Sequence, residues 1–396
     1  MRIVHSSDWH LGRSLKGNSL IEPQRVFLTE LGRLAEQSDI DAILVAGDIY
    51  DRAIPPTEAV SLLAEVLTSL AASCPIILIP GNHDSALRLG FGAELLATAG
   101  VHVLADPGAV DRPVEVTNGS STILIYGIPY LEPELVYRRL GAERSHASVL
   151  DAAMGRIRDD VHHRRASAAE RGTPEPHAVV MAHAFITGGT ASDSEKDITV
   201  GGVADAPGEV FRGMDYVALG HLHGPQQVRT TEDSVIRYSG SPLPYSFSEE
   251  DHVKSVTIVE FHERDSRDGR ALVTVEEVPT TVTRRMRTIT GTLDSLMTDT
   301  ALAGDEGSWI RAVLTDEIRP ERAMERLQQR FPYAIELVPR EVDIAAMTEE
   351  QLPLIDDPVE VAAAFLEYVT GDPTSASDRA LVMAALEAHR IDETSQ

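Results

Sequence analysis

Apolar runs alternate with amphipathic stretches through the first quarter of the chain. Near-continuous apolar segments at 2–8, 41–48 and 75–81 predict strands buried on both faces, because such strands show no polar alternation. Between them, residues 23–39 and 56–72 repeat apolar side chains at helical spacing. This order of strands and helices favours an α/β fold in which helices cover both faces of a sheet.

The alternation continues to about residue 280 and includes one long polar segment. Further strands are predicted at 102–105, 122–129, 177–184, 214–221, 234–242 and 252–262. Helices are predicted at 86–99 and within 133–171. Residues 186–202 are polar and rich in glycine, and a loop of this length in a compact domain is often functional.

After residue 280 the pattern changes to a small unit and an acidic tail. Strands at 283–291, 308–316 and 333–341 with a helix at 320–331 predict a small α/β unit. The tail reads as two helices, at 357–369 and 375–389, separated by a Gly-Asp-Pro turn. The chain is therefore expected to have three parts, 1–280, 281–341 and 342–396.

Polar side chains follow five of the apolar strands at the points where the strands end. They are Asp8, His10, Asp48, Asn82, His83, Asp84, His183, His221 and His223. Ligands of α/β sheets gather at the carboxyl ends of strands, so these side chains are expected to converge on one site. Capping or solvated loop residues are the alternative interpretation of each one alone.

The residue types in this set are those of a two-metal centre. Carboxylate, imidazole and amide oxygen together suit Mn²⁺, Fe²⁺ or Zn²⁺. Two such ions about 3.5–4 Å apart can activate a water and stabilise both the attacking and the leaving oxygen of a phosphoryl group.

Charge and cysteine content limit the possible binding partners and the cellular compartment of the protein. The 35 basic and 62 acidic side chains give a net charge of −27, which argues against broad attraction to nucleic acid. Residues 341–396 alone carry 13 acidic side chains against two arginines. The single Cys74 excludes an internal disulfide, and no signal peptide or membrane-spanning run is evident, so a cytoplasmic location is expected.

Several segments carry a family resemblance. They are "HSSDWHLGRSL", "VAGDIYDRAIPP", "PGNHDS", "DYVALGHLHGPQ" and "RYSGSPLPYSFSE". They resemble the calcineurin-like metallophosphoesterase superfamily and, within it, the bacterial SbcD nuclease subunits; the later "WIRAVLTDE" is similar to the small cap domain of that family. The resemblance implies a four-layer α/β (α+β) core with two packed mixed β-sheets flanked by helices, a small α/β cap that covers DNA, and a helical tail.

The resemblance also implies a role for each polar residue. One metal would be held by Asp8, His10, Asp48 and His223, and the second by Asp48, Asn82, His183 and His221. His83 would face the scissile phosphate and assist the leaving 3′ oxygen, and Asp84 would orient His83. Asp51 stands where archaeal and eukaryotic relatives carry a histidine, so it is assigned no catalytic role.

Positively charged residues are weaker candidates. Arg13, Lys16, Lys196, Arg284 and Arg285 are candidate DNA contacts, with ordinary surface charge as the rival interpretation. The basic stretch 156–171 is interpreted as a solvated helix face.

The function implied is a Mn²⁺-dependent DNA nuclease of an SbcCD complex. The family hydrolyses duplex ends as a 3′–5′ exonuclease and single strands and hairpins as an endonuclease, in DNA repair, recombination and replication. The expected partners are the SbcC ATPase, through the tail stripe Val361, Phe365, Leu366 and Val369, and a second copy of the chain, through helices 56–72 and 86–99. Packing within the chain is the rival interpretation of both surfaces. A small-molecule or cyclic-nucleotide phosphodiesterase and a non-catalytic DNA-end scaffold are the alternative functions.

Overall fold

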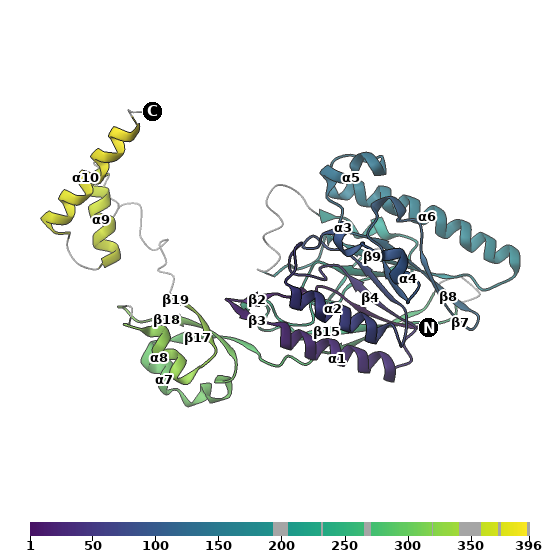
Figure 1. The fold of residues 1–396 in the computed structure, drawn as a ribbon, viewed down its shortest axis with the longest axis horizontal. Coiled ribbons are helices and arrows are strands. Elements are labelled where there is room, and N and C mark those ends of the chain that lie inside the picture. The colour runs from purple at the N-terminus through teal and green to yellow at the C-terminus, as the bar shows by residue number, and fades with distance from the viewer. Residues whose placement is uncertain are drawn as a thin grey trace. The chain divides into compact units, whose positions relative to one another are not determined.

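The computed structural model describes most of the chain, which divides into two compact units (Figure 1). The described residues are 1–192, 205–230, 233–264, 271–318, 320–339, 358–370 and 374–393. The first unit is Met1–Pro339 and the second is Arg340–Gln396. None of the described helices is long and apolar enough to cross a membrane.

Two six-stranded mixed sheets form the centre of the first unit. The first has the order β16 (Val273–Pro279), β15 (Ser255–Phe261), β1 (Arg2–Ser6), β4 (Ala42–Ala46), β5 (Ile76–Ile79) and β6 (Val101–Val103). The second has the order β13 (Gln226–Val228), β14 (Val235–Tyr238), β12 (Tyr216–Gly220), β9 (His177–His183), β8 (Ser121–Ile128) and β7 (Val114–Asn118). The strands β1, β4, β5 and β6 run parallel, as do β8, β9, β12 and β14.

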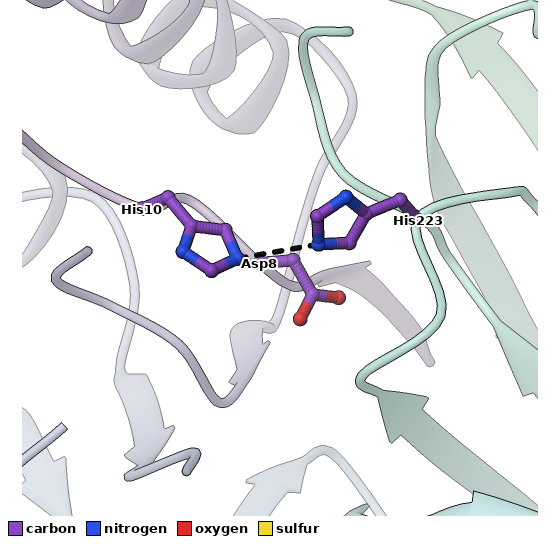
Figure 2. Close-up of side chains that lie close together, drawn as sticks. All are labelled: Asp8, His10 and His223. Atoms are coloured by element: carbon purple, nitrogen blue, oxygen red, sulfur yellow. Dashed lines mark hydrogen bonds between the residues drawn. The ribbon is translucent and has the colours of Figure 1, made fainter. Parts of the chain in front are cut away.

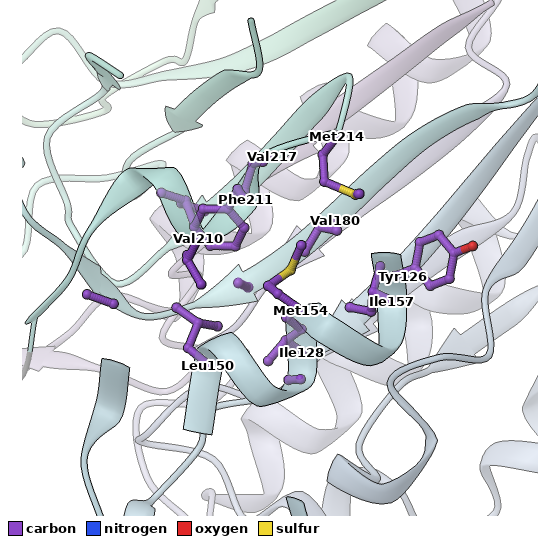
Figure 3. Packing of buried hydrophobic residues seen from close by; sticks show 14 of the residues in the cluster. Tyr126, Ile128, Leu150, Met154, Ile157, Val180, Val210, Phe211, Met214 and Val217 are labelled. Atoms are coloured by element: carbon purple, nitrogen blue, oxygen red, sulfur yellow. The ribbon is translucent and has the colours of Figure 1, made fainter. Parts of the chain in front are cut away.

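Helices lie on the outer face of each sheet and complete four layers. On the first sheet lie α1 (Ile21–Gln37) and α2 (Thr57–Leu70), whose Phe27, Leu31 and Leu62 share a buried cluster with Val4 and Val45. On the second lie α5 (Pro133–Leu140) and α6 (His146–Arg171), as Figure 3 shows for Leu150, Met154 and Ile157.

Between the two sheets a third cluster includes Ile3, Leu44, Ile77, Ile125 and Met181. These side chains alternate along their strands with those that face the helices, which is why the strands read as continuous apolar runs. The predicted fold class is confirmed.

Two predicted helical stretches are interrupted. Residues 86–99 form α3 (Ala86–Leu89) and α4 (Ala93–Ala97), because Gly92 between them has a φ of 73°. The stretch 133–171 divides at Gly141, which ends α5 in the left-handed conformation, and α6 restarts after Ser145, whose hydroxyl accepts a hydrogen bond from the Ser148 amide.

The remaining short elements of the described chain join the layers. They are β2 (Ser14–Leu15), β3 (Asn18–Ser19), β10 (Phe185–Ile186), β11 (Asp205–Ala206) and the 3₁₀ turns η1 (Pro107–Ala109), η3 (Gly208–Phe211), η4 (Phe247–Glu249) and η5 (Thr300–Asp305).

The predicted small α/β unit belongs to the same compact unit as the sheets. It contains β17 (Met286–Gly291), α7 (Leu293–Thr298), β18 (Trp309–Leu314), α8 (Ala323–Arg330) and β19 (Ala334–Pro339), with all three strands parallel. It has its own core, which includes Ile289, Ile310 and Phe331. A separate cluster joins Met286 of β17 to Leu15 and other residues of the larger part. The proposed division at residue 281 stays a prediction.

The second unit contains α9 (Pro358–Thr370) and α10 (Ala376–Glu393). The two helices are joined by an ion pair between Glu360 and Arg379 and by a 2.8 Å hydrogen bond from the Thr374 hydroxyl to the Ala363 carbonyl oxygen. Val361 and Phe365 of the predicted stripe are 51% and 62% exposed, whereas the side chain of Val369 lies outside the described residues.

Candidate metal centre

The predicted ligands come together at the carboxyl ends of five parallel strands from both sheets. Asp8 and His10 follow β1, Asp48 follows β4, Asn82 follows β5, His183 ends β9, and His221 and His223 follow β12. Each of the six Asp and His side chains is at most 6% exposed. The two sheets place these strand ends at one edge of the sandwich, as the sequence predicts.

The backbone at these strand ends is unusual. Among the described residues, seven other than glycine have a positive φ, and four of these are predicted ligands. Their φ angles are 53° at Asp8, 45° at His10, 49° at Asp48 and 107° at His221. A side chain in this region costs about 1–3 kcal/mol and persists where the surroundings enforce it, often at functional sites.

The first group of ligand atoms is Asp8, His10 and His223, whose donor atoms all lie within 4.8 Å of one another. Figure 2 shows the two rings pointing toward each other, with the Asp8 carboxylate beside them. Nε2 of His10 lies 3.2 Å from Nε2 of His223 and 3.5 Å from a carboxylate oxygen of Asp48.

The second group is Asp8, Asp48 and His183, again within 4.8 Å. Nε2 of His183 lies 3.5 Å from Asp48 and 2.9 Å from Oδ1 of Asn82. The ring of His221 packs edge-on against that of His183 at 5.3 Å, and its backbone amide donates to Asp8 at 3.1 Å. Asp48 therefore lies beside both histidines, His10 and His183, as a bridging ligand requires.

These groups fit divalent cations. His183 donates from Nδ1 to the Ala46 carbonyl oxygen at 3.0 Å, so its Nε2 carries a lone pair, and that lone pair faces the Asn82 oxygen. His223 likewise donates from Nδ1 to Glu249 at 3.1 Å and turns its Nε2 toward His10. Nε2 of His183 and Oδ1 of Asn82 are two acceptor atoms at hydrogen-bond distance, which repel each other unless a cation lies between them.

Burial prepares the same groups for metal binding. Desolvation lowers the pKa of His10 to about 4 and that of His221 to about 3, and it also lowers the pKa of His183. Burial alone would raise the pKa of Asp48, but His183, His10 and His83 outweigh it and hold this pKa well below its usual range. Neutral imidazoles beside an ionised carboxylate are the protonation states that bind a metal.

Two glycines beside the ligands have no room for a side chain. A Cβ on Gly220 would lie 1.7 Å from the Ala46 carbonyl oxygen, and a Cβ on Gly81 would lie 2.1 Å from Oδ1 of Asp48. The glycines of the G-H-L-H and G-N-H-D segments therefore let the strand ends approach closely enough to share ligands.

The described hydrogen bonds of Asp84 go to the main chain and not to His83, so its predicted role in orienting His83 stays a prediction. Its two carboxylate oxygens accept hydrogen bonds from the backbone amides of Ile49, Tyr50 and Gly81, each at 2.9 Å. Nδ1 of His83 instead lies 2.9 Å from the Asp51 carbonyl oxygen. Asp84 thus fastens the loop after β4 to the loop after β5. Burial and the charge of Asp48 raise the pKa of Asp84 to about 7.

Asp51 is a loop residue beside the site. Its carboxylate lies 3.4 Å from Nδ1 of His10 and 3.1 Å from the guanidinium of Arg13. These contacts fit a supporting residue, in line with the absence of an assigned catalytic role. They also mean that Arg13, which stacks over Tyr245 at 5.1 Å, already has an acidic partner.

The other candidate DNA contacts are spread out. Lys16 forms a 3.1 Å ion pair with Glu336 of β19, Arg284 stacks on Trp309 and Tyr333, and Arg285 is exposed. Lys196 lies outside the described residues. The basic stretch of α6, predicted to be a solvated helix face, forms ion pairs with acidic residues of the same unit, such as Arg156 with Asp111 and Arg165 with Asp215.

Sequence reasoning missed the residues behind the ligands. Gln24 of α1 donates to the carbonyl oxygens of Trp9 and His10, at 3.2 Å and 2.7 Å, and holds the first metal loop. Glu249 and Lys254 are buried next to His223. The signal for Glu249 was its place in the segment "RYSGSPLPYSFSE", and Gln24 had no signal beyond its place on a helix.

With this geometry described, comparison with known proteins identifies the family. The model of the calcineurin-like phosphoesterase family matches residues 1–225, more than half of the chain. The chain belongs to the calcineurin-like phosphoesterase family. A second family model, described as the type 5 capsule protein repressor C-terminal domain, matches residues 282–370 of this phosphoesterase.

Curated relatives of the phosphoesterase are SbcD subunits of the nuclease SbcCD. The present chain is 28% identical over 341 residues to the SbcD subunit of Staphylococcus epidermidis, and the match covers 85% of each chain. It is 35% identical over 263 residues to the SbcD subunit of Bacillus subtilis, covering 66% of each chain. The corresponding protein of Staphylococcus saprophyticus is 28% identical over 348 residues, covering 87% of this chain and 86% of that one. The predicted resemblance to the SbcD subunits is confirmed.

Proposed function

We propose that this chain is a metal-dependent DNA nuclease, the catalytic subunit of an SbcCD-type complex that processes double-strand ends and hairpins. The observation that carries the proposal is the buried group of Asp8, Asp48 and four histidines at the edge of two sheets, with His83 beside it. Similarity to the SbcD subunits of the nuclease SbcCD over most of the chain supports the choice of substrate.

Two divalent ions, manganese in the first place, are the proposed cofactors. Asp8, His10, Asp48 and His223 would hold one, and Asp48, Asn82, His183 and His221 the other. Such a pair of ions supplies an activated water and positive charge for a phosphodiester group. That charge also offsets the acidic surface of the chain, whose net charge is −27.

The chain's own residues orient the reaction. His83 has its Nδ1 held by the Asp51 carbonyl oxygen at 2.9 Å, and its backbone amide donates to Oδ1 of Asp48, also at 2.9 Å. These two contacts fix the imidazole next to the bridging carboxylate. In the imidazolium form the ring also carries a proton on Nε2, which it can donate to the leaving 3′ oxygen or use to stabilise charge on the phosphate.

A nuclease assay of the full chain tests this function. Purified protein, with and without an SbcC-type ATPase partner, is incubated with end-labelled duplex and hairpin DNA in Mn²⁺, Mg²⁺ or Zn²⁺. Degradation that needs Mn²⁺ and is lost in Asp48→Asn supports the proposal. Intact DNA together with rapid hydrolysis of bis-p-nitrophenyl phosphate or cyclic nucleotides would indicate a small-molecule phosphodiesterase. DNA binding without any cleavage would indicate a non-catalytic scaffold.

The domain roles follow from the same proposal. Residues 1–280 would form the nuclease, 281–341 would cap the DNA, and 342–396 would bind the SbcC-type ATPase. The exposure of Val361 and Phe365 supports docking of α9 on a partner, since neither is covered within the described residues. DNA binding by the isolated chain is expected to be weak and sensitive to salt, because of its negative charge.

A homodimer is the proposed assembly. A cavity of about 810 Å³ lies among α2, α3, α4 and the edge of the first sheet, and its lining includes Val60, Leu67 and Leu96. Beside it Leu87, Phe91 and Leu95 are 88%, 85% and 78% exposed. Leu62 and Leu63 of α2, in contrast, are buried in the chain's own core. An apolar surface of this kind suits an isologous contact with a second copy.

A further inference from the structure

A buried carboxylate and a buried ammonium group contact His223 on the side away from the predicted metal site. Glu249 and Lys254 are only 1% and 2% exposed. Oε1 of Glu249 accepts a hydrogen bond from Nδ1 of His223 at 3.1 Å. Nζ of Lys254 donates to the backbone carbonyl oxygen of His223 at 2.9 Å and also to Oε2 of Glu249. The pair therefore contacts both the ring and the main chain of this one residue.

Both charged groups have further hydrogen-bond partners among the described residues. Oε2 of Glu249 also accepts from the Tyr245 amide at 3.2 Å and lies 3.4 Å from the Ser241 hydroxyl, whose proton the Leu243 carbonyl oxygen accepts at 2.8 Å. Nζ of Lys254 donates to the same hydroxyl at 2.9 Å. Apolar residues often stabilise a core as well as a buried ion pair does. The buried pair of Glu249 and Lys254, with this many hydrogen bonds, therefore suggests a role other than stabilising the fold.

The contact decides which nitrogen of His223 is available. A neutral imidazole that donates from Nδ1 to a carboxylate has an unprotonated Nε2, and the carboxylate makes that nitrogen a better ligand. In this structure Nε2 of His223 points at Nε2 of His10, 3.2 Å away, inside the first group of ligand atoms. The opposite tautomer would place a proton where a metal ion must bind.

We propose that Glu249 and Lys254 are positioning residues for His223, fixing its tautomer and the direction of its ring so that Nε2 faces a metal ion. This inference rests on the proposed function, because His223 is a metal ligand only in a metal-dependent enzyme. Neither residue touches the substrate or the reacting atoms in this assignment. Both act through His223.

Two double variants of the full chain separate positioning from general stability. Glu249→Leu with Lys254→Met removes both charges and the acceptor of the Nδ1 proton. Glu249→Gln with Lys254→Met removes the same charges but keeps an oxygen that can accept that proton. The matched control, Glu277→Gln with Arg237→Met, removes the ion pair between β14 and β16, which has no described contact with a predicted ligand.

The first readout is Mn²⁺ binding, measured by equilibrium dialysis and metal analysis. The wild-type chain is expected to bind two ions. The leucine-containing variant should bind one of them about 10- to 100-fold more weakly, the usual effect of losing such a partner. The glutamine-containing variant should recover much of this loss, and the control should bind as wild type does.

The second readout is the histidine ¹⁵N spectrum of the metal-free protein at about pH 8, where an ordinary imidazole is neutral. The signal of His223, assigned by its loss in His223→Gln, should show a protonated Nδ1 in the wild type. It should move toward the other tautomer in the leucine-containing variant.

Two results would overturn the inference. One is a folded leucine-containing variant with wild-type Mn²⁺ affinity and an unchanged His223 signal. The other is a wild-type protein whose His223 is protonated on Nε2, which decides the question even if that variant does not fold. Failure of the proposed function looks different, since the wild-type chain itself would then bind no pair of ions or leave DNA intact.

Discussion

The Asp51 carbonyl oxygen lies 2.9 Å from Nδ1 of His83, so the main chain of one loop orients the imidazole of the next. The Asp51 side chain points elsewhere, to His10 and Arg13. A backbone acceptor does not depend on residue type. A different residue at position 51 would therefore leave this contact to His83 in place.

Replacing His83 should separate catalysis from metal binding. Because His83 is assigned to the leaving oxygen, His83→Gln should lower the rate of DNA hydrolysis by about 10²- to 10⁴-fold. Bound Mn²⁺, measured by metal analysis, should stay at the wild-type level. His102→Gln, at a half-buried histidine of β6, is the matched control. Full activity of His83→Gln would remove the assigned role.

A methyl group at Gly220 should destroy the site. Its Cβ would lie 1.7 Å from the Ala46 carbonyl oxygen, so β12 and β4 would have to move apart and separate His221 from Asp48, the ligand that follows β4. We expect Gly220→Ala to lose Mn²⁺ binding or to fold poorly, measured by metal analysis and thermal melting. Gly307→Ala, where no atom lies within 4 Å of the added Cβ, should behave as wild type. A wild-type Gly220→Ala protein would contradict the close approach of the two strands.

Acid should destabilise the metal-free fold through His5. Burial lowers the pKa of His5 to about 3, with a smaller opposing effect from the Leu219 carbonyl oxygen. In the unfolded chain this pKa is about 6.5, so between these pH values the unfolded state binds the extra proton. Stability from this group is complete above about pH 6.5 and falls as the pH falls, by up to about 1.4 kcal/mol per pH unit.

Urea unfolding in EDTA at about pH 7.5 and about pH 5.5 measures this effect. The loss of unfolding free energy between the two pH values should be about 1 kcal/mol smaller in His5→Gln than in wild type. An equal loss in both proteins would mean that His5 takes up its proton in the folded state.

The exposed face of α9 should be required for the ATPase partner. Phe365→Ser removes a 62% exposed aromatic side chain, so it should weaken binding to an SbcC-type ATPase by at least about tenfold, a typical effect at a hot spot. Co-purification and isothermal titration measure the loss, with Ala364→Ser as the neighbouring control. Binding unchanged in Phe365→Ser would favour another surface.

A charge in the exposed apolar surface of α3 and α4 should dissociate the proposed dimer. Leu95→Glu places a carboxylate on a residue that is 78% exposed in the single chain, so folding should be unaffected while self-association is lost. Sedimentation velocity should give a dimer for the wild type and a monomer for the variant. Leu135→Glu, at an 81% exposed residue of α5, is the control. A monomeric wild type would refute the assembly.

Local sequence patterns predicted most of the helices and strands, but few of the positions at which a helical stretch is interrupted. The strands β1, β4, β5, β9 and β12 were predicted because double burial leaves uninterrupted apolar runs. The strand β16 was missed, since most of its residues are exposed and it carries two glutamates. The division of 86–99 was missed as well, because a left-handed glycine looks like any other glycine in a sequence.

The sequence by itself determined which side chains could bind metal, because Asp, His and Asn recur where apolar strands end. It did not determine how each one is held. That Asp84 binds three backbone amides instead of His83, that a backbone carbonyl orients His83, and that Glu249 and Lys254 hold His223 were decided only by the tertiary structure. The physical reason is that a motif fixes the order of residues along the chain, whereas hydrogen-bond partners depend on loops from different strands meeting at about 3 Å in space.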